Sequence, residues 1–178
     1  DSDPVHKVTI IPRGATGGVT WFLPPEDKNY TSVVEFKDVL ARALGGRIAE
    51  KIIYGEDRIT TGAGSDLRKA TEIARDMIIE QGMGTKLRDQ VFHEDNGGLM
   101  FDRMTRERPY SDETAKEIDH EVAELIKEAA KRAEAVIKSN MDKLKDLAMA
   151  LLKEETLEED TVAKILEGSV LPKEAKLY

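Results

Sequence analysis

Cysteine is absent from the 178-residue sequence, and several other residue types are scarce. Without cysteine the chain forms no disulfide, offers no thiolate to a metal ion and has no thiol nucleophile for covalent catalysis. Aromatic residues make up only 5% of the chain, whereas charged residues make up 35%. This composition favours helices packed on helices over a β-sandwich, which draws more heavily on aromatic and β-branched residues.

A net positive charge and a long hydrophobic run are also missing. The formal net charge is −8 at pH 7, so we expect no nucleic-acid partner, because no basic stripe is available to neutralise phosphates. No apolar run approaches the roughly 20 residues that a membrane-spanning helix needs, and no signal peptide is recognisable. We expect this segment to be soluble, and this expectation is compatible with a membrane anchor elsewhere in a longer parent chain.

The apolar content is sufficient for one mainly helical domain with a small β region at its N-terminus. Hydrophobic residues make up 40% of the chain. Two β-branched runs, at residues 7–12 and 19–23, predict two strands within residues 1–24, which form a hairpin or lie side by side in a small sheet. A glycine-rich turn at residues 13–18 joins the strands rather than opening a helix, so we do not expect it to cradle a phosphate.

Residues 31–81 are predicted to form the core helices. The first helix, capped by Thr31 or Ser32, runs to about residue 54 with an apolar stripe on one face. The glycine pair at residues 45–46 lies inside this helix, where each glycine is less favourable than alanine by about 1 kcal/mol. We therefore expect another backbone to pack closely against the pair. The second helix begins at Ser65 or Asp66 and ends near residue 81.

The second half of the chain is predicted to be an irregular surface excursion followed by helices. Residues 85–109 carry an Asn-Gly-Gly sequence and no apolar periodicity, so we expect a loop. Residues 111–167 are predicted to form the C-terminal helices, of which the first is capped by Ser111 and has an apolar stripe with a period of 3.6 residues. We expect residues 1–171 to form the domain and residues 172–178 to be a fraying tail.

Few residues in this chain are suited to catalysis. His6, His93 and His120 lie too far apart in the sequence for any two to share a helix face, so we do not expect them to form a metal site. Their more ordinary roles are structural or solvated ones. Serine occurs in predicted caps and loops, and no Gly-x-Ser-x-Gly sequence marks a nucleophile for acyl transfer.

Two carboxylates stand out among the remaining candidates. Asp66 lies where a glycine-bearing loop enters a helix, and its stripe continues through Ala70, Ile73 and Met77. We therefore expect it to head a buried face, where it needs backbone donors, a cationic side chain or a metal ion. Backbone capping is the ordinary role of an acid at a helix start. For Glu50, in the middle of the preceding helix, the ordinary interpretation is a solvated side chain paired with a neighbouring Arg47 or Lys51.

Four segments change this balance, because their residues and order resemble those of a known family. They are Asp-Pro-Val-His-Lys-Val-Thr-Ile-Ile-Pro-Arg-Gly at 3–14, Leu-Gly-Gly-Arg-Ile-Ala-Glu at 44–50, Thr-Thr-Gly-Ala-x-x-Asp-Leu-x-x-Ala-Thr at 60–71, and Ser-Asp-Glu-Thr at 111–114. This pattern resembles the peptidase domain of the FtsH family of ATP-dependent, membrane-anchored zinc metalloproteases. The resemblance runs from residue 3 to about residue 152 and implies a helical zinc-metalloprotease domain.

The resemblance implies a role for each of the two carboxylates. The family's third zinc ligand is the aspartate of the Thr-Gly-Ala-x-x-Asp-Leu segment, which falls on Asp66. Glu50 falls on the glutamate of the Gly-Gly-Arg-x-Ala-Glu segment and is the rival ligand; we favour Asp66 and expect Glu50 to have a structural or outer-shell role. Ser65 stands where the family usually has asparagine, and both residues are good N-caps.

One part of the family pattern is missing from these residues. The family's other two zinc ligands and its general base lie in a His-Glu-x-x-His helix just upstream of the segment at 3–14, and this motif occurs nowhere in the 178 residues. A catalytic zinc site needs three protein ligands and an activated water. We therefore expect this chain alone neither to bind catalytic zinc nor to cleave peptides. His6 is not a substitute, since it follows the motif in the family pattern and is no ligand there.

For the parent protein the resemblance implies an enzyme that degrades unfolded or membrane proteins. An ATP-binding module on a separate part of the parent would feed unfolded polypeptides into a homo-hexamer or related hetero-oligomer. The domain would lie on the cytoplasmic, matrix or stromal side of the membrane that anchors the parent. We expect the strand formed by Val19, Thr20, Trp21 and Phe22 to align an extended substrate by strand addition. The alternative is a catalytically inactive relative that serves as a structural or oligomerisation module.

Overall fold

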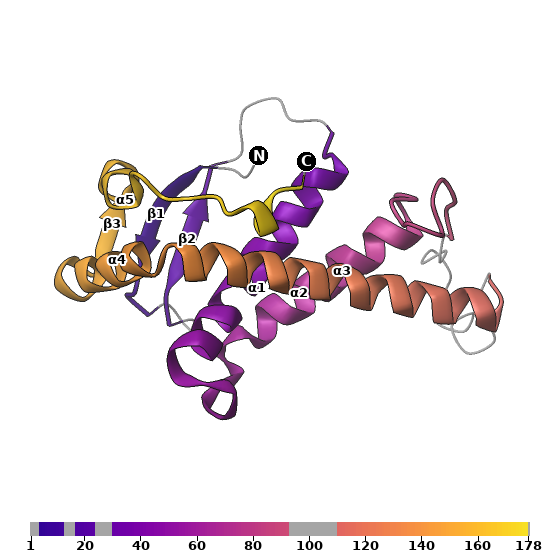
Figure 1. Ribbon diagram of the computed structural model, residues 1–178, viewed down its shortest axis with the longest axis horizontal. Helices are drawn as coiled ribbons and strands as arrows, with labels where there is room; N and C mark the ends of the chain where they lie inside the picture. Colours follow the sequence, from indigo (N-terminus) through magenta and orange to yellow (C-terminus); the bar gives the residue numbers. More distant parts are fainter. Residues whose placement is uncertain (1–3, 13–16, 24–29, 93–109, 178) are drawn as a thin grey trace. The chain divides into compact units, whose positions relative to one another are not determined.

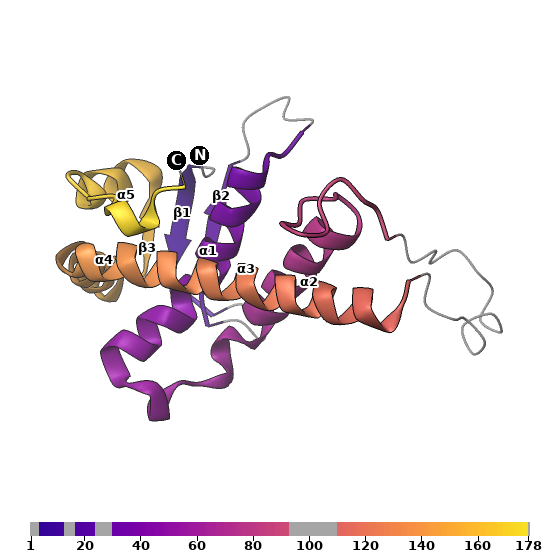
Figure 2. The same ribbon diagram turned by 45° about the vertical axis from the view of Figure 1, so that its right-hand side comes forward.

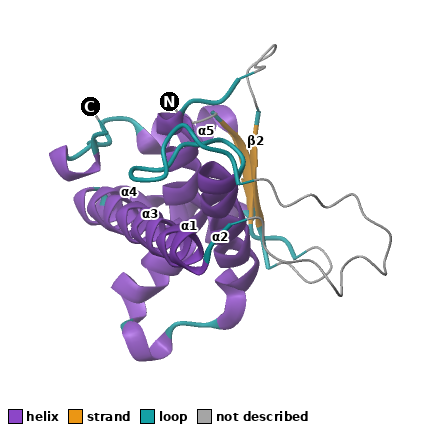
Figure 3. Cartoon of the chain, turned by 90° about the vertical axis from the view of Figure 1, so that its right-hand side faces the viewer, coloured by secondary structure: helices purple, strands orange, loops and turns teal. Residues whose placement is uncertain are grey.

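The computed structural model describes residues 4–12, 17–23, 30–92 and 110–177. Its contacts divide the chain into two compact units, one made of residues 1–38 and 131–178 and the other of residues 39–130. Among the described residues helices are the main element, and a small sheet lies in the first unit (Figure 3). The prediction of a mainly helical chain with a small β region near its N-terminus is confirmed. No helix in the described ranges is long and apolar enough to cross a membrane.

The first unit is built on a three-stranded antiparallel sheet in the order β2-β1-β3, which Figure 1 shows beside α4 and α5. The strands are β1 (Val5–Thr9), β2 (Val19–Phe22) and β3 (Thr156–Glu158). The predicted hairpin partners β1 and β2 do pair, but β1 ends before Ile10, which is exposed. The third strand, β3, is an addition to the prediction.

A bulge in β1 directs two valines onto the same hydrophobic core. The pairing of β1 with β2 shifts register between Val5 and Lys7. In a regular strand, side chains three positions apart point to opposite faces of the sheet, and the bulge at this register shift changes that alternation. Val5 and Val8 therefore both pack against the buried cluster of Leu151, Leu157 and Val162.

Thr9 joins β1 to the end of α4 (Met141–Glu154). The Thr9 side chain is buried, and its hydroxyl donates to the Glu155 carbonyl over 3.0 Å and lies 2.8 Å from the Thr156 hydroxyl. The neighbouring Gly18 allows this arrangement, since a Cβ there would lie 2.7 Å from the Thr9 carbonyl oxygen. The polar groups of this buried corner are thereby satisfied.

The C-terminal residues are not the fraying tail that composition predicts. α5 (Glu159–Leu166) is followed by a 3₁₀ turn, η4 (Lys173–Ala175), and Ala175 is only 1% exposed. The Ala175 carbonyl accepts a hydrogen bond of 3.0 Å from Nε of Arg132. This segment is part of the first unit's core.

The second unit contains most of α1 (Val33–Tyr54), all of α2 (Gly64–Ile79) and the first part of α3 (Asp112–Ser139). Two 3₁₀ turns, η1 (Glu56–Arg58) and η2 (Thr61–Ala63), connect α1 to α2 (Figure 2). The helix stripes follow the predicted periodicity, with Leu40, Leu44 and Ile48 buried on α1. Ser32, one of the two predicted N-caps of α1, forms a cap with Glu35 in which each side chain accepts from the other residue's backbone N–H.

Of two further predictions about the second unit, one is wrong and the other can be compared with the structure only in part. α1 continues through Gly45 and Gly46, and a Cβ at either position would meet no described atom within 4 Å, so the expected close backbone contact is wrong for this part of the chain. The predicted excursion at residues 85–109 lies mostly outside the described residues. Its first part, at residues 85–92, does form a loop without helix or extended strand.

Candidate functional site

Asp66 lies in the first turn of α2, close to the predicted helix start. Its side chain is exposed, and within the described ranges it has no hydrogen-bond or ion-pair partner. The stripe of α2 is buried at Ala70, Ala74 and Met77, but the first turn is not covered. The prediction of a buried Asp66 is therefore wrong for the described chain, in which no residue binds either oxygen of the carboxylate.

The start of α2 is formed without a side-chain cap of its own. Ala63 occupies the N-cap position and Ser65 lies inside the helix. The prediction that Ser65 caps α2 is therefore wrong. Capping occurs instead one turn earlier, where the Thr60 hydroxyl accepts from the Gly62 N–H at the start of η2. The residue after η2, Gly64, is also the first residue of α2, so the two helices are continuous.

Glu50 and Arg47, both on α1, hold the loop that leads to this helix. The Glu50 carboxylate is half-buried and accepts from the Thr60 hydroxyl over 2.8 Å and from the Thr60 N–H over 3.2 Å. Nη1 of Arg47 donates to the Thr60 carbonyl oxygen over 3.0 Å. Glu50 thus binds a loop rather than forming the solvated pair with Arg47 or Lys51; Lys51 instead pairs with Glu56 at 2.8 Å.

The histidines do not gather around Asp66. His6 lies on β1 in the first unit, with Nδ1 3.6 Å from a Glu159 carboxylate oxygen, and His120 is exposed on α3. His93 lies outside the described residues. The described ranges contain no cluster of three or more histidine, aspartate or glutamate side chains able to hold a metal ion.

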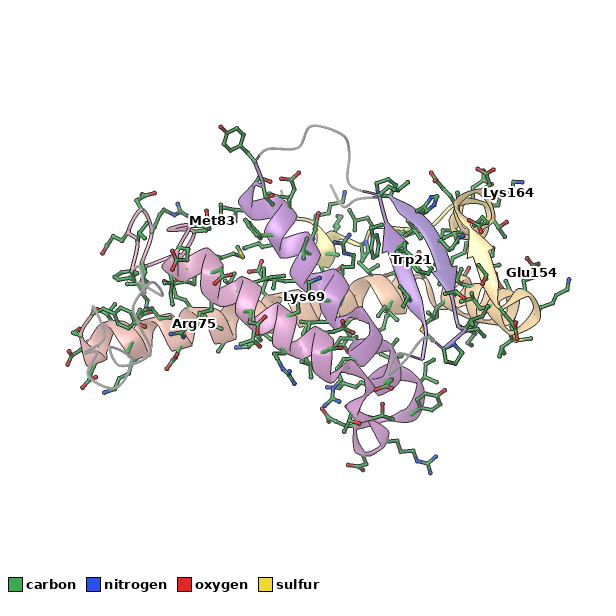
Figure 4. The ribbon with its side chains drawn as sticks, turned by 180° about the vertical axis from the view of Figure 1, so that it is seen from behind. Trp21, Lys69, Arg75, Met83, Glu154 and Lys164 are labelled. Carbon is green, nitrogen blue, oxygen red and sulfur yellow. The ribbon has the colours of Figure 1, made fainter. Side chains whose placement is uncertain are left out.

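The predicted substrate strand, β2, is an edge strand of the sheet in the first unit. Its Val19, Trp21 and Phe22 are half-buried, and Thr20 is exposed (Figure 4 labels Trp21). One side of β2 pairs with β1, and no described strand pairs with the other side. An edge of this kind can accept an added strand.

A third carboxylate, Glu121 on α3, organises the loop after α2, and the sequence did not mark it as a candidate. The Glu121 side chain is buried and accepts from the backbone N–H groups of Thr85, Lys86 and Leu87 at 2.7, 2.6 and 3.1 Å. Gly84 makes room for it, because a Cβ there would lie 2.5 Å from Oε2. The signal that could have found Glu121 is its position on the apolar stripe of α3, three residues after the buried Ile118.

The backbone donors keep Glu121 ionised. Burial opposes ionisation, but the hydrogen bonds from residues 85–87 and the charge of Lys86 together hold the pKa of Glu121 below its ordinary value. A carboxylate that accepts several backbone N–H groups is a structural anchor for the loop. Nothing in this arrangement places a substrate against it.

We expect Glu121→Gln to lower the free energy of unfolding by about 2 kcal/mol at pH 7. The hydrogen bonds from the backbone N–H groups of residues 85–87 to a charged carboxylate become weaker bonds to a neutral amide, and the amide NH₂ faces one of these N–H donors. Because the folded pKa of Glu121 is depressed, its stabilising effect is complete above the unfolded value of about 4.3 and is lost as pH falls through the folded pKa. Urea unfolding between pH 7 and pH 3 should therefore show the two proteins converging in acid. Glu124→Gln, which removes an exposed ion pair with Lys127 on the same helix, should cost under about 1 kcal/mol. Equal losses for both variants would contradict the anchor role.

Comparisons with known proteins agree on one family. The family model described as peptidase family M41 matches residues 1–165. The chain is 45% identical over 167 residues to the ATP-dependent zinc metalloprotease FtsH of Caldicellulosiruptor bescii, covering 93% of this chain and 27% of that protein. It is 42% identical over 174 residues to the protein of the same name from Bacillus subtilis, covering 97% of this chain and 27% of that protein.

The ATP-dependent zinc metalloprotease FtsH of Haemophilus influenzae is 42% identical over 167 residues, which are 93% of this chain and 26% of that protein. The chain thus spans about a quarter of the length of the curated relatives that it matches. The family match covers the loop with Thr60, the first turn of α2 and the helix that carries Glu50. The chain belongs to peptidase family M41, and its resemblance to the peptidase domain of FtsH is confirmed.

Proposed function

We propose that this chain is part of an ATP-dependent zinc metalloendopeptidase and that Asp66 is one of its three zinc ligands. The observation that carries the proposal is the exposed Asp66 carboxylate, which has no partner in the described ranges, at the head of α2 in a chain of peptidase family M41. An aspartate that merely capped the helix would accept from backbone N–H groups, and Asp66 accepts from none of the described ones.

The donor chemistry of Asp66 fits zinc, since carboxylate oxygens, imidazole nitrogens and thiolates are the ordinary zinc ligands. Asp66 supplies one of three ligands, and the resemblance assigns the other two to the histidines of a His-Glu-x-x-His motif that these residues do not contain. When bound, zinc would supply Lewis-acid chemistry for the activation of water and of a peptide carbonyl. In this proposal Asp66 holds the metal, and Glu50 holds the loop that carries Asp66.

The edge of β2 supplies a second element of the proposal. An extended polypeptide that was added to the sheet edge beside β2 would be held by main-chain hydrogen bonds, which are independent of its sequence. This mode of binding suits an enzyme that degrades many unfolded proteins. The residues assigned to the substrate are Val19, Thr20, Trp21 and Phe22.

The whole-protein properties belong to the same proposal. The full-length protein would carry an ATP-binding module and a membrane anchor outside these residues, and would assemble as a hexamer or related hetero-oligomer. The domain would lie on the cytoplasmic, matrix or stromal side. An inactive structural relative is less well supported, because it has no use for a carboxylate such as that of Asp66, which has no partner among the described residues.

Metal removal tests the proposal directly. We expect EDTA to abolish ATP-dependent casein cleavage by the full-length protein and one equivalent of zinc per chain to restore it. The isolated 178-residue chain should hold no stoichiometric zinc and cleave no casein, because it offers one ligand and three are needed. Cleavage by the full-length protein that survives complete metal removal, or stoichiometric zinc with cleavage in the isolated chain, would contradict the proposal.

A further inference from the structure

Every polar group of Thr60 is held by a neighbouring residue. Its N–H and hydroxyl donate to the two oxygens of the Glu50 carboxylate, and its carbonyl accepts from Arg47. The hydroxyl oxygen also accepts from the Gly62 N–H over 3.2 Å. A residue bound at all of these groups has little freedom to rotate about its backbone or its side chain.

The two residues that hold Thr60 form a matched pair on α1. Arg47 and Glu50 are three positions apart, so they lie on the same helix face. The Glu50 carboxylate accepts from the N–H and the hydroxyl of Thr60, and the Arg47 guanidinium donates to the Thr60 carbonyl. Hydrogen bonds to charged groups such as these are stronger than hydrogen bonds between neutral groups. Residues that lie 13 and 10 positions away in the sequence therefore fix the end of the α1–α2 connection.

A short rigid path leads from Thr60 to Asp66. Thr60 is the N-cap of η2, and the Gly64 N–H donates to the Thr61 carbonyl at the end of η2. Gly64 is also the first residue of α2, which carries Asp66 in its first turn. No irregular residue lies between Thr60 and Asp66, so fixing Thr60 fixes the backbone position of Asp66.

We propose that Arg47 and Glu50 are positioning residues for the metal-binding carboxylate: they hold Thr60, and through η2 they hold the turn that presents Asp66. This inference rests on the proposed function and adds a role for three residues that do not themselves touch the metal. It also explains why the segments at 44–50 and 60–71 carry the resemblance together, since three hydrogen bonds join them. Because the exposed Asp66 side chain has no partner among the described residues, these residues orient it through its backbone.

Thr60→Val in the full-length protein is the sharpest test, because valine has nearly the volume of threonine and lacks only the hydroxyl. We expect zinc affinity, measured by competition with a chelator, to fall about 10–100-fold, as it does when outer-shell partners of metal ligands are changed. Thr60→Ser, which restores the hydroxyl, should return the affinity to the wild-type value. Glu50→Ala should weaken zinc binding in the same way. In the double variant it should weaken binding little beyond Thr60→Val alone, since both changes disrupt the same set of hydrogen bonds from Arg47 and Glu50 to Thr60, which we call the Thr60 clamp.

Thr71→Val is the matched control. Thr71 lies on α2, and its hydroxyl donates to the Leu67 carbonyl over 2.9 Å within the helix, so the same substitution there leaves the clamp intact. Its zinc affinity should equal that of the wild type. Thermal unfolding of the metal-free proteins separates positioning from stability: a Thr60→Val protein that unfolds earlier but binds zinc normally would overturn the inference.

The inference and the proposed function fail in different ways. Zinc retained by Asp66→Asn would overturn the proposed function, because the ligand would then lie elsewhere. Zinc lost by Asp66→Asn but kept by Thr60→Val and Glu50→Ala would overturn the positioning role alone. Zinc lost by all three, with rescue by Thr60→Ser, supports both.

Discussion

Asp66→Asn in the full-length protein should lower zinc affinity by more than about 100-fold, because a change to an outer-shell partner already costs up to that factor. Asparagine keeps the size of the side chain and removes the anionic oxygen that zinc prefers. Casein cleavage should disappear with the metal. Zinc content by elemental mass spectrometry and cleavage of labelled casein measure the two effects independently.

The same change should hardly alter the stability of the metal-free protein. The Asp66 carboxylate is exposed and has no described partner, so its loss removes only an acid near a helix N-terminus, worth at most about 1 kcal/mol. Thermal unfolding after EDTA treatment should therefore give nearly equal midpoints for the variant and the wild type. A large loss of metal-free stability would show that Asp66 has a structural partner instead.

Asp76→Asn is the matched control for this prediction. Asp76 is an exposed aspartate on the same helix, ten positions after Asp66, and makes no described side-chain contact. It should keep both zinc and casein cleavage. If Asp66→Asn also kept one equivalent of zinc, the rival ligand Glu50 would become the candidate, and Glu50→Gln should then release the metal.

The helices could be predicted from the sequence because their signals are local. The apolar stripe of α1 and the cap formed by Ser32 and Glu35 are both contained within a few residues, and the structure has both. The hairpin of β1 and β2 is local as well. β3 could not be predicted in this way, because a strand of three residues between two helices shows no periodicity and is defined only by its pairing with β1, about 150 positions away.

The sequence pointed to Asp66 and Glu50 as candidate site residues, but not to the exposure of Asp66 or to the residue that Glu50 binds. Extrapolating the α2 stripe back to Asp66 assumes that every turn of the helix is covered, whereas the described chain covers only the later turns. The partner of Glu50 was also missed. Thr60 lies ten positions away across a turn, and no helix-face rule relates the two residues.

The long helix α3 has two charged residues buried on its apolar face. Its predicted stripe is buried at Ile118, Ala129 and Ala133, but Glu121 and Arg132 lie on the same stripe and are buried too. Charged residues are ordinarily placed on the solvent face of such a helix. The stripe marks both positions as candidates for burial, but the groups that bind these two side chains come from distant segments, so the sequence pattern could not identify them.

Arg132→Met should lower the free energy of unfolding by about 3 kcal/mol, the lower end of the range for removing one partner of a buried ion pair. Nη2 of Arg132 lies 2.6 Å from Oδ1 of Asp38, and the two side chains are 11% and 15% exposed. Nε of Arg132 also donates to the Ala175 carbonyl. The substitution therefore removes the contact between α3 and the start of α1 together with a hydrogen bond that holds η4.

Lys138→Met provides a control on the same helix. Lys138 lies 2.6 Å from Glu134, but its side chain is 60% exposed, so the loss of this pair should cost under about 1 kcal/mol. The N–O distances in the two ion pairs are equal, but the Arg132 pair is the more buried and Arg132 alone also binds the Ala175 carbonyl, so the larger loss is expected for Arg132→Met. Urea unfolding of both variants at neutral pH measures the difference.

A double-mutant cycle with Asp38→Asn separates the ion pair from the other contacts of Arg132. We expect a coupling energy between about 1 and 3 kcal/mol, since the two side chains are in direct contact and largely excluded from water. Hydrogen exchange should quicken at the Ala175 and Lys176 amides in Arg132→Met, because η4 loses its donor to the core, while Asp38→Asn leaves that donor in place. Zero coupling, or unchanged exchange in η4, would show that Arg132 is buried at this position without joining the two segments.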